Sequence, residues 1–103
     1  PILRELSFDA DGAIASDRIL FDAAPFAEDG SPGLPDGMAV DAAGRIFLTG
    51  PGGIFVVAPQ GQVLGRIRMP KATANCAFGG DGSRLFITSS DKLYELPTKT
   101  MGI

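Results

Sequence analysis

The sequence predicts an all-β protein of antiparallel strands, and three observations support this prediction. Short apolar or alternating runs, separated by Gly, Pro and Asp, fill nearly all of the 103 residues, which is typical of strands joined by tight turns. No Gly-free and Pro-free stretch of helical length follows a helical period, so we expect no helix. An internal repeat divides the strands into groups, each of which has the size of a single sheet.

Nine strands are expected along the chain. The turns between them contain glycine where a positive φ is needed, and aspartate where a side chain can hydrogen-bond the turn backbone, as in Asp9–Gly12 and Gly80–Ser83. The one long connection, residues 23–35, contains three Pro and two Gly and is expected to be a loop. The expected strands are residues 2–8, 14–21, 37–41, 45–49, 53–58, 62–68, 75–79, 84–88 and 92–96.

The internal repeat predicts how the strands assemble. Residues 36–49 align with residues 75–88 at an offset of 39, which places Phe47 on Phe86. A weaker match lays residues 8–12 over residues 57–61, so the strands group as two, four and three. Repeats of about 40–50 residues with four antiparallel strands are the blades of β-propellers, which close with about 4–8 blades. The fold class that we predict is therefore all-β, in the form of a partial β-propeller.

The chain would hold about two and a quarter blades of such a propeller. We expect residues 1–22 to be the last two strands of one blade, residues 36–68 to be a complete blade, and residues 75–96 to be three strands of the final blade. Each blade buries both faces against its neighbours, so an open stack leaves two apolar faces in water. We therefore expect that the chain is not a stable monomer. The missing blades would come from the rest of a longer protein, from another chain or from another copy of this one.

The composition excludes several classes of function. Nine Lys and Arg against twelve Asp and Glu give a net charge of −3, so we expect no nucleic-acid partner. The chain has no His, which removes Ser-His-Asp and Cys-His catalytic units and histidine-ligated metals. Its single cysteine, Cys76, excludes an internal disulfide and, without a histidine partner, is expected to pack in an inner strand. Oxygen ligands remain, the set that calcium, magnesium and manganese prefer.

The apolar runs of the sequence are short. None approaches the ~20 residues of a membrane-spanning helix, so we expect a soluble protein without a membrane partner. The single cysteine fits a reducing compartment, and we favour the cytoplasm over the periplasm or secretion on that ground. An exported protein would have the same features, so the compartment stays open.

Two polar residues stand at the start of first strands in the repeat. At an offset of 39, Asp36 falls on Asn75. The first strand of a blade lines the propeller axis, so we expect both side chains at the mouth of the central channel. Their oxygens suggest a site for a hard cation, of which they supply two of the six to eight ligands that Ca²⁺ takes. Asp36 is also explained as a turn residue in Pro-Asp-Gly, and Asn75 as a local cap.

Two motifs carry a resemblance to a known family. Residues 33–44 read GLPDGMAVDAAG and are followed by residues 74–80, which read ANCAFGG. With these motifs in this order and spacing, the sequence resembles the gluconolactonase/senescence-marker-protein (regucalcin) family over nearly its whole length. The resemblance implies a six-bladed propeller, of which this chain is the C-terminal third. It also implies that a strand from the N-terminal segment closes the ring at the last blade.

The resemblance further implies an activity and a cofactor. Family members hydrolyse lactones and, in some branches, other esters such as organophosphates. They use a divalent metal at the centre of one face, usually Ca²⁺, with Mg²⁺, Mn²⁺ or Zn²⁺ as alternatives. The family's other metal ligands, a glutamate in the first blade and an asparagine in a middle blade, have no counterpart in this chain. Its substrate-contacting Arg and Asn have none either.

The family motifs assign roles to particular residues here. Asp36 matches the aspartate of the Pro-Asp-Gly motif, which implies a metal ligand and a general base, and Met38 and Val40 match the strand that follows it. Asn75 matches the first residue of the Asn-Cys-Ala-Phe-Gly-Gly motif, which implies a pocket-lining or structural residue. The ligand role of Asp36 is the firmer one, because a carboxylate bound to a divalent cation has a depressed pKa and is a poor free base.

Two classes of function therefore stand as alternatives. The first is part of a metal-dependent lactonase whose site is completed by blades absent from this chain, so that the isolated chain is expected to be inactive. The second is a non-catalytic β-propeller module that binds a ligand or a protein, in which Asp36 is only a turn residue. A third arrangement, a ring of identical chains, would place several Asp36 carboxylates around one axis.

Overall fold

The computed structural model describes residues 1–103 and contains nine strands and one short 3-10 helix. All nine expected strands are present, with bounds that differ from the predicted ones by a residue or two. No helix in the structure is long and apolar enough to cross a membrane. The elements are β1 (Ile2–Phe8), β2 (Ile14–Asp22), η1 (Ala24–Ala27), β3 (Met38–Val40), β4 (Ile46–Gly50), β5 (Gly53–Val57), β6 (Val63–Arg68), β7 (Thr73–Gly79), β8 (Arg84–Ser89) and β9 (Lys92–Pro97).

The prediction of no helix is wrong at η1. This single turn contains Pro25, whose fixed φ suits the start of a helix. The Asp22 carboxylate accepts a hydrogen bond from the Ala24 amide (2.9 Å), and the Phe26 amide donates to the Ala23 carbonyl (3.0 Å). A helix of four residues is too short to show a helical period in the sequence, so periodicity could not find it.

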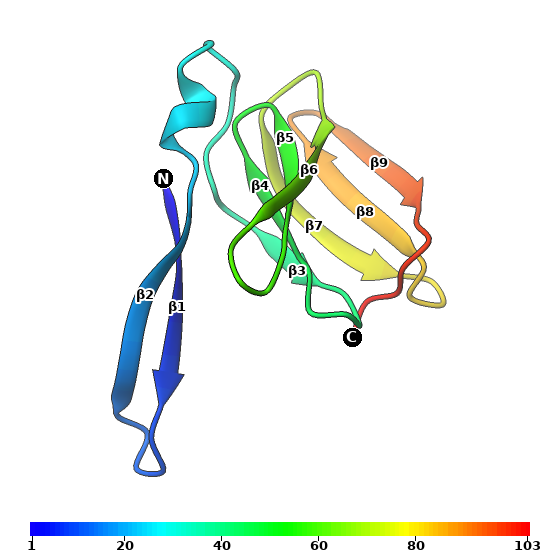
Figure 1. The fold of residues 1–103 in the computed structure, drawn as a ribbon. Helices are drawn as coiled ribbons and strands as arrows, with labels where there is room; N and C mark the ends of the chain where they lie inside the picture. The colour runs from blue at the N-terminus through cyan, green and yellow to red at the C-terminus, as the bar shows by residue number, and fades with distance from the viewer.

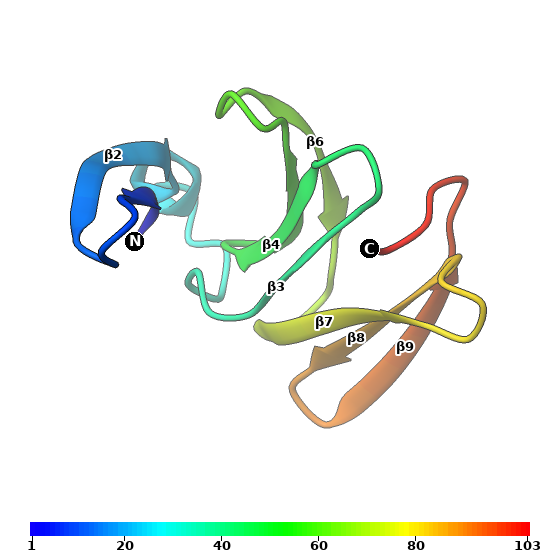
Figure 2. The same cartoon turned by 90° about the horizontal axis from the view of Figure 1, so that it is seen from below.

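The strands form three antiparallel sheets (Figure 1). They contain two, four and three strands, in the orders β1-β2, β3-β4-β5-β6 and β7-β8-β9, which is the grouping that the repeat predicts. Seen from below, β3 and β7 lie side by side where the second and third sheets meet, and the β1–β2 hairpin stands at the opposite edge (Figure 2). The identification of these sheets with particular blades of a longer ring stays a prediction.

Alternation along the central strands explains how one sheet packs on both neighbours. On β4 and β5, Leu48 and Phe55 point to the face that carries the hairpin, and Phe47 and Ile54 point to the face that carries the third sheet. The first face buries a cluster with the hairpin residues Leu3, Leu20 and Phe21, and the second buries a cluster with Cys76, Leu85 and Ile87. The four-stranded sheet is therefore covered on both faces, as an inner blade of a stack must be.

The far end of the β1–β2 hairpin is not covered. Leu6, Phe8, Ile14 and Ile19 have between 42% and 61% of their surface exposed. Ion pairs between Arg4 and Asp17 and between Arg18 and Glu5 link the two strands, but such exposed pairs contribute little stability. The hairpin presents apolar surface of the kind that another part of a propeller would cover.

Residues 98–103 connect the third sheet to the second. The Asp41 carboxylate, fully buried, accepts hydrogen bonds from the amides of Ala43 and Arg45 (3.0 and 2.8 Å), from Arg45 Nε (2.7 Å) and from Thr100 Oγ1 (3.0 Å). The Ala42 amide donates to the Met101 carbonyl (2.7 Å). The turn between β3 and β4 is therefore bonded to a segment that follows β9.

Candidate active site

Asp36 lies on the segment that enters β3, between the second and third sheets. Its amide donates a hydrogen bond to Thr49 Oγ1 (3.0 Å) on β4. The next residue, Gly37, donates its amide to the Ala74 carbonyl on β7 (2.9 Å) and accepts a hydrogen bond from the Thr49 amide (3.0 Å). Hydrogen bonds to the second and the third sheet therefore hold the backbone around Asp36, and this fixes the position from which its side chain extends.

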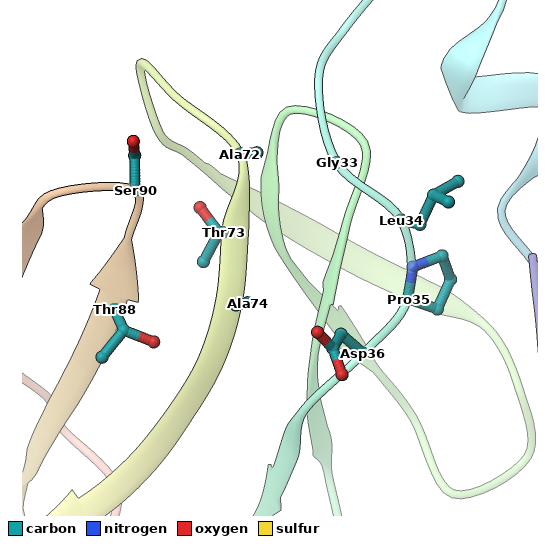
Figure 3. Close-up of a pocket in the computed structure, with 9 residues that line it drawn as sticks. All are labelled: Gly33, Leu34, Pro35, Asp36, Ala72, Thr73, Ala74, Thr88 and Ser90. Carbon is teal, nitrogen blue, oxygen red and sulfur yellow. The ribbon is translucent and has the colours of Figure 1, made fainter.

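The Asp36 carboxylate is exposed and has no hydrogen-bond or ion-pair partner in the chain. It points from its loop toward β7, and the Thr88 hydroxyl points into the same space from β8 (Figure 3). The space is an open pocket of about 680 Å³ in which Asp36 is the only charged residue. Its lining is Gly33, Leu34, Pro35, Asp36, Ala72, Thr73, Ala74, Thr88 and Ser90.

Three hydroxyl residues line this pocket, and the sequence predicted none of them as site residues: Thr73, whose hydroxyl donates to the Lys71 carbonyl (3.2 Å), Thr88 and Ser90. Ser90 has a φ of 53°, a left-handed conformation that is uncommon outside glycine. Its amide donates to the Ala72 carbonyl (3.0 Å), which ties the turn after β8 to the start of β7. The expected strands at 84–88 and 92–96 predict a turn at residues 89–91, but no local pattern shows which turn residue faces a pocket.

The predicted equivalence of Asp36 and Asn75 is wrong by one residue. In the third sheet, Asn75 on β7 pairs with Thr88 on β8. The residue that aligns with Thr88 in the second sheet is Thr49, and its amide donates to the Gly37 carbonyl. Asn75 is therefore equivalent to Gly37 and not to Asp36. The first strands of the two sheets therefore match at an offset of 38, and the second strands at 39. The reason is that the turn between β7 and β8 is one residue longer than the turn between β3 and β4. Residues 80–83 separate the paired Gly79 and Arg84, whereas only residues 42–44 separate Asp41 and Arg45, which a backbone hydrogen bond joins (3.0 Å).

The Asn75 side chain lies beside the Asp36 segment but outside its pocket. Its Oδ1 accepts a hydrogen bond from the Cys76 amide (2.9 Å). The side chain packs against Gly37, where a Cβ atom would lie 2.0 Å from Asn75 Oδ1. Asn75 lines a separate hollow of about 150 Å³, to which Thr88 also contributes. Asp36 and Asn75 are thus near each other on neighbouring sheets, but their side chains line different pockets.

Replacing Gly37 by alanine is expected to separate β3 from β7. The added methyl group would lie 2.4 Å from Asn75 Cγ and 2.8 Å from Asn75 Cα, and the backbone contact cannot be relieved by a rotamer change. We expect a loss of about 1–3 kcal/mol in the free energy of unfolding, measured by urea denaturation. The matched control is Gly65→Ala, where a Cβ would meet no atom within 4 Å. Equal stability of the two variants would contradict this packing.

Cys76 packs in the interior, as predicted, and lies on β7, the first strand of the third sheet. Its side chain is buried, and Sγ donates to the Phe47 carbonyl (3.3 Å). Burial raises the pKa of the thiol to about 11, so the thiolate needed for nucleophilic attack is scarce at neutral pH. Cys76 has the environment of a packing residue.

The oxygen ligands around Asp36 are of the chemical type that a hard divalent cation prefers, but there are too few of them to complete a site. A free carboxylate is the ligand that Ca²⁺ and Mg²⁺ prefer, and the pocket contains hydroxyl and carbonyl oxygens. No group of three or more His, Cys, Asp or Glu residues in the chain is arranged to hold a metal ion. One strong ligand is therefore what this chain can supply.

Comparison with known proteins gives consistent matches. A family model described as "SMP-30/Gluconolactonase/LRE-like region" matches residues 2–91. A gluconolactonase from Zymomonas mobilis is 43% identical over 77 residues, which cover 73% of this chain and 22% of that protein. A 6-deoxy-6-sulfogluconolactonase from Pseudomonas putida is 38% identical over 93 residues, which cover 86% of this chain and 31% of that protein.

A solved structure gives the same match in three dimensions. A protein provisionally described as a gluconolactonase has a TM-score of 0.85 and 30% sequence identity, and the match covers 99% of this chain and 33% of the other. The three sheets are a partial β-propeller, as the repeat predicts. The chain spans between about a fifth and a third of the length of these three proteins.

Proposed function

Because this chain belongs to the SMP-30/gluconolactonase/LRE-like family, we propose that it is part of a lactonase that depends on a divalent metal ion. The membership confirms the resemblance found in the sequence. The observation that carries the proposal is the Asp36 carboxylate, which is exposed, unpaired and held between two sheets in a pocket without other charges. The substrate class is a small lactone or a related ester.

Lactone hydrolysis adds water to the carbonyl carbon and breaks the bond between that carbon and the ring oxygen, which gives a hydroxy acid. The reaction needs a group that accepts a proton from water and a group that favours negative charge on the carbonyl oxygen. Asp36 carries the one carboxylate of the pocket, so it is the candidate proton acceptor. The Ser90 hydroxyl is available to orient water or a substrate hydroxyl, whereas the Thr88 hydroxyl donates to the Asn75 carbonyl (3.3 Å) and is left as an acceptor.

The metal part of the proposal rests on the type of ligand that Asp36 provides. A bound divalent cation supplies Lewis-acid chemistry, which favours negative charge on the lactone carbonyl oxygen. Calcium is the first candidate, with magnesium, manganese and zinc as alternatives. Asp36 would hold the cation with one carboxylate, and its ligand role ranks above its role as a base because a bound carboxylate has a lower pKa.

The remaining ligands are proposed to come from blades outside this chain. The chain supplies one carboxylate, whereas a calcium ion takes six to eight oxygens. The exposed apolar side chains on β1 and β2 support the same conclusion, because burying them against a further blade would stabilise the assembly by roughly 25 cal/mol per Å². Those blades belong either to the rest of a longer protein or to other chains.

The test is lactone hydrolysis by the assembled protein before and after metal removal. We expect that a chelator abolishes acid release from a sugar δ-lactone, measured at constant pH, and that added Ca²⁺ or another divalent ion restores it. Calorimetry should detect calcium binding by the same protein. Hydrolysis that survives chelation would contradict the metal requirement. The absence of both hydrolysis and calcium binding would favour a non-catalytic propeller module.

A further inference from the structure

A pair of arginines lies near the Asp36 pocket without belonging to it. Arg66 and Arg68 alternate along β6, so both side chains leave the same face of the four-stranded sheet. Neither arginine takes part in any of the chain's ion pairs. Two guanidinium groups without a carboxylate partner repel each other, and a bound anion would remove that repulsion.

The two guanidinium groups converge on Gly52. A Cβ atom at Gly52 would lie 3.4 Å from Nη1 of Arg66 and 3.4 Å from Nη1 of Arg68, so the two nitrogens are at most twice that distance apart. Ser31 Oγ lies 3.4 Å from the same point. Because position 52 is a glycine, no side chain fills the space between these polar groups.

Arg66 is held in place before any ligand arrives. Its guanidinium lies 5.2 Å from the ring centre of Phe55 and 5.7 Å from that of Phe26, distances at which a cation is attracted to an aromatic face. Its Nη1 donates to the Pro51 carbonyl (3.1 Å). The Arg68 side chain is exposed and takes part in none of the chain's side-chain hydrogen bonds, so its donors are free.

One carboxylate stands near the arginine pair. Asp29 accepts a hydrogen bond from the Ser31 amide (2.9 Å) and makes no ion pair with either arginine. The hydrogen bonds from Ser31 are the main cause of its lowered pKa, and the charges of Arg66 and Arg68 lower it further. With Asp29 ionised, Arg66, Arg68 and Asp29 together still have a net charge of +1, so a bound anion would neutralise the cluster.

The arginine pair and the Asp36 pocket lie on opposite faces of the four-stranded sheet. Arg66 stands opposite Phe55 on the neighbouring strand, on the face that packs against the β1–β2 hairpin. The Asp36 pocket opens between this sheet and the third sheet. The Gly52 amide donates to the Pro32 carbonyl (2.8 Å), so the long loop crosses the β4–β5 turn between the two places.

We propose that Arg66 and Arg68, with Ser31, form a binding site for a small anion of the carboxylate, phosphate or sulfonate class. Arginine suits this role because its planar donors pair with two oxygens of such a group. The site is separate from the Asp36 pocket, so it does not depend on the proposed hydrolase function.

The first experiment measures inorganic phosphate binding to the assembled protein at constant ionic strength, by titration calorimetry. We expect saturable binding that Arg68→Gln weakens about tenfold or more. Lys92→Gln is the matched control, because it removes one positive charge from an exposed side chain that makes no ion pair, and it should bind phosphate as the unchanged protein does. No saturable binding, or equal binding by Arg68→Gln, would overturn the site.

The second experiment tests whether the anion site is separate from the Asp36 pocket. We expect Arg68→Gln to hydrolyse an uncharged lactone with a kcat/KM within about twofold of that of the unchanged protein, because Arg68 does not line the pocket. A large loss of hydrolysis in Arg68→Gln would overturn the separation of the two sites. If no lactone is hydrolysed, the proposed function has failed, and the phosphate titration still decides the anion site.

Discussion

Replacing Asp36 by asparagine is expected to reduce lactone hydrolysis by at least about 10³-fold. The amide keeps the size of the side chain but removes the negative charge, so it can neither hold a divalent cation strongly nor accept a proton from water. The fold should not change, because the carboxylate is exposed and bonds to nothing in the chain, and the Asp36 amide keeps its bond to Thr49. The measurement is kcat/KM together with calcium affinity in the assembled protein.

Glu28→Gln is the matched control for this variant. Glu28 is also an exposed carboxylate on the long loop and forms no ion pair, so the same chemical change there should leave the rate within about twofold. The urea midpoints of both variants should equal that of the unchanged protein. An Asp36→Asn protein that kept most of its activity, or its calcium affinity, would show that Asp36 is only a turn residue.

Replacing Asp41 by alanine is expected to cause the largest loss of stability, about 2–4 kcal/mol. The change removes a buried acceptor that takes hydrogen bonds from two turn amides, from Arg45 Nε and from Thr100 Oγ1. The Arg45 guanidinium loses its ion-pair partner, and residues 98–103 lose one of their attachments. A lower urea midpoint with an unchanged m value is the expected result.

Thr100→Val separates the two parts of this effect. It removes only the bond from Thr100, so we expect a loss of about 1 kcal/mol. If Asp41→Ala were no less stable than Thr100→Val, the buried carboxylate would contribute nothing beyond that one bond.

The acid dependence of stability gives a second check on Asp41. Burial alone would raise the pKa of Asp41, but the hydrogen bonds from Arg45 and Thr100 outweigh it and the net shift is downward. A carboxyl group whose pKa is lower in the folded state stabilises the protein above its unfolded pKa, near pH 4, and loses that contribution as the pH falls further. The difference in stability between the protein and Asp41→Ala should therefore shrink below about pH 4.

The strands were predictable because alternation is a local property. On β4 and β5, each apolar residue that faces one sheet is followed by one that faces the other, and glycines mark the turns. The register between neighbouring sheets was not predictable in the same way. It depends on a turn that is one residue longer in one sheet than in the other, and a sequence repeat aligned on the second strands conceals that residue.

The candidate site was predictable only at Asp36, whose Pro-Asp-Gly motif identifies it in the sequence. Thr88 and Ser90 reach the pocket through the pairing of β7 with β8 and the path of the following turn. Arg66 and Arg68 come together with Ser31 across more than thirty residues of chain. Such contacts depend on how the sheets pack in space, and no local sequence pattern predicts them.

The bond between Asp41 and Thr100 joins residues 59 positions apart, and this has a consequence during translation. On the ribosome, the segment from β3 to β6 is synthesised before residues 98–103. In that interval the nascent sheet holds its β3–β4 turn with Arg45 but lacks Thr100 and the bond from Ala42 to Met101. Contacts of high sequence separation form late. Docking of residues 98–103 is therefore expected to be a late event in the synthesis and folding of this part of the propeller.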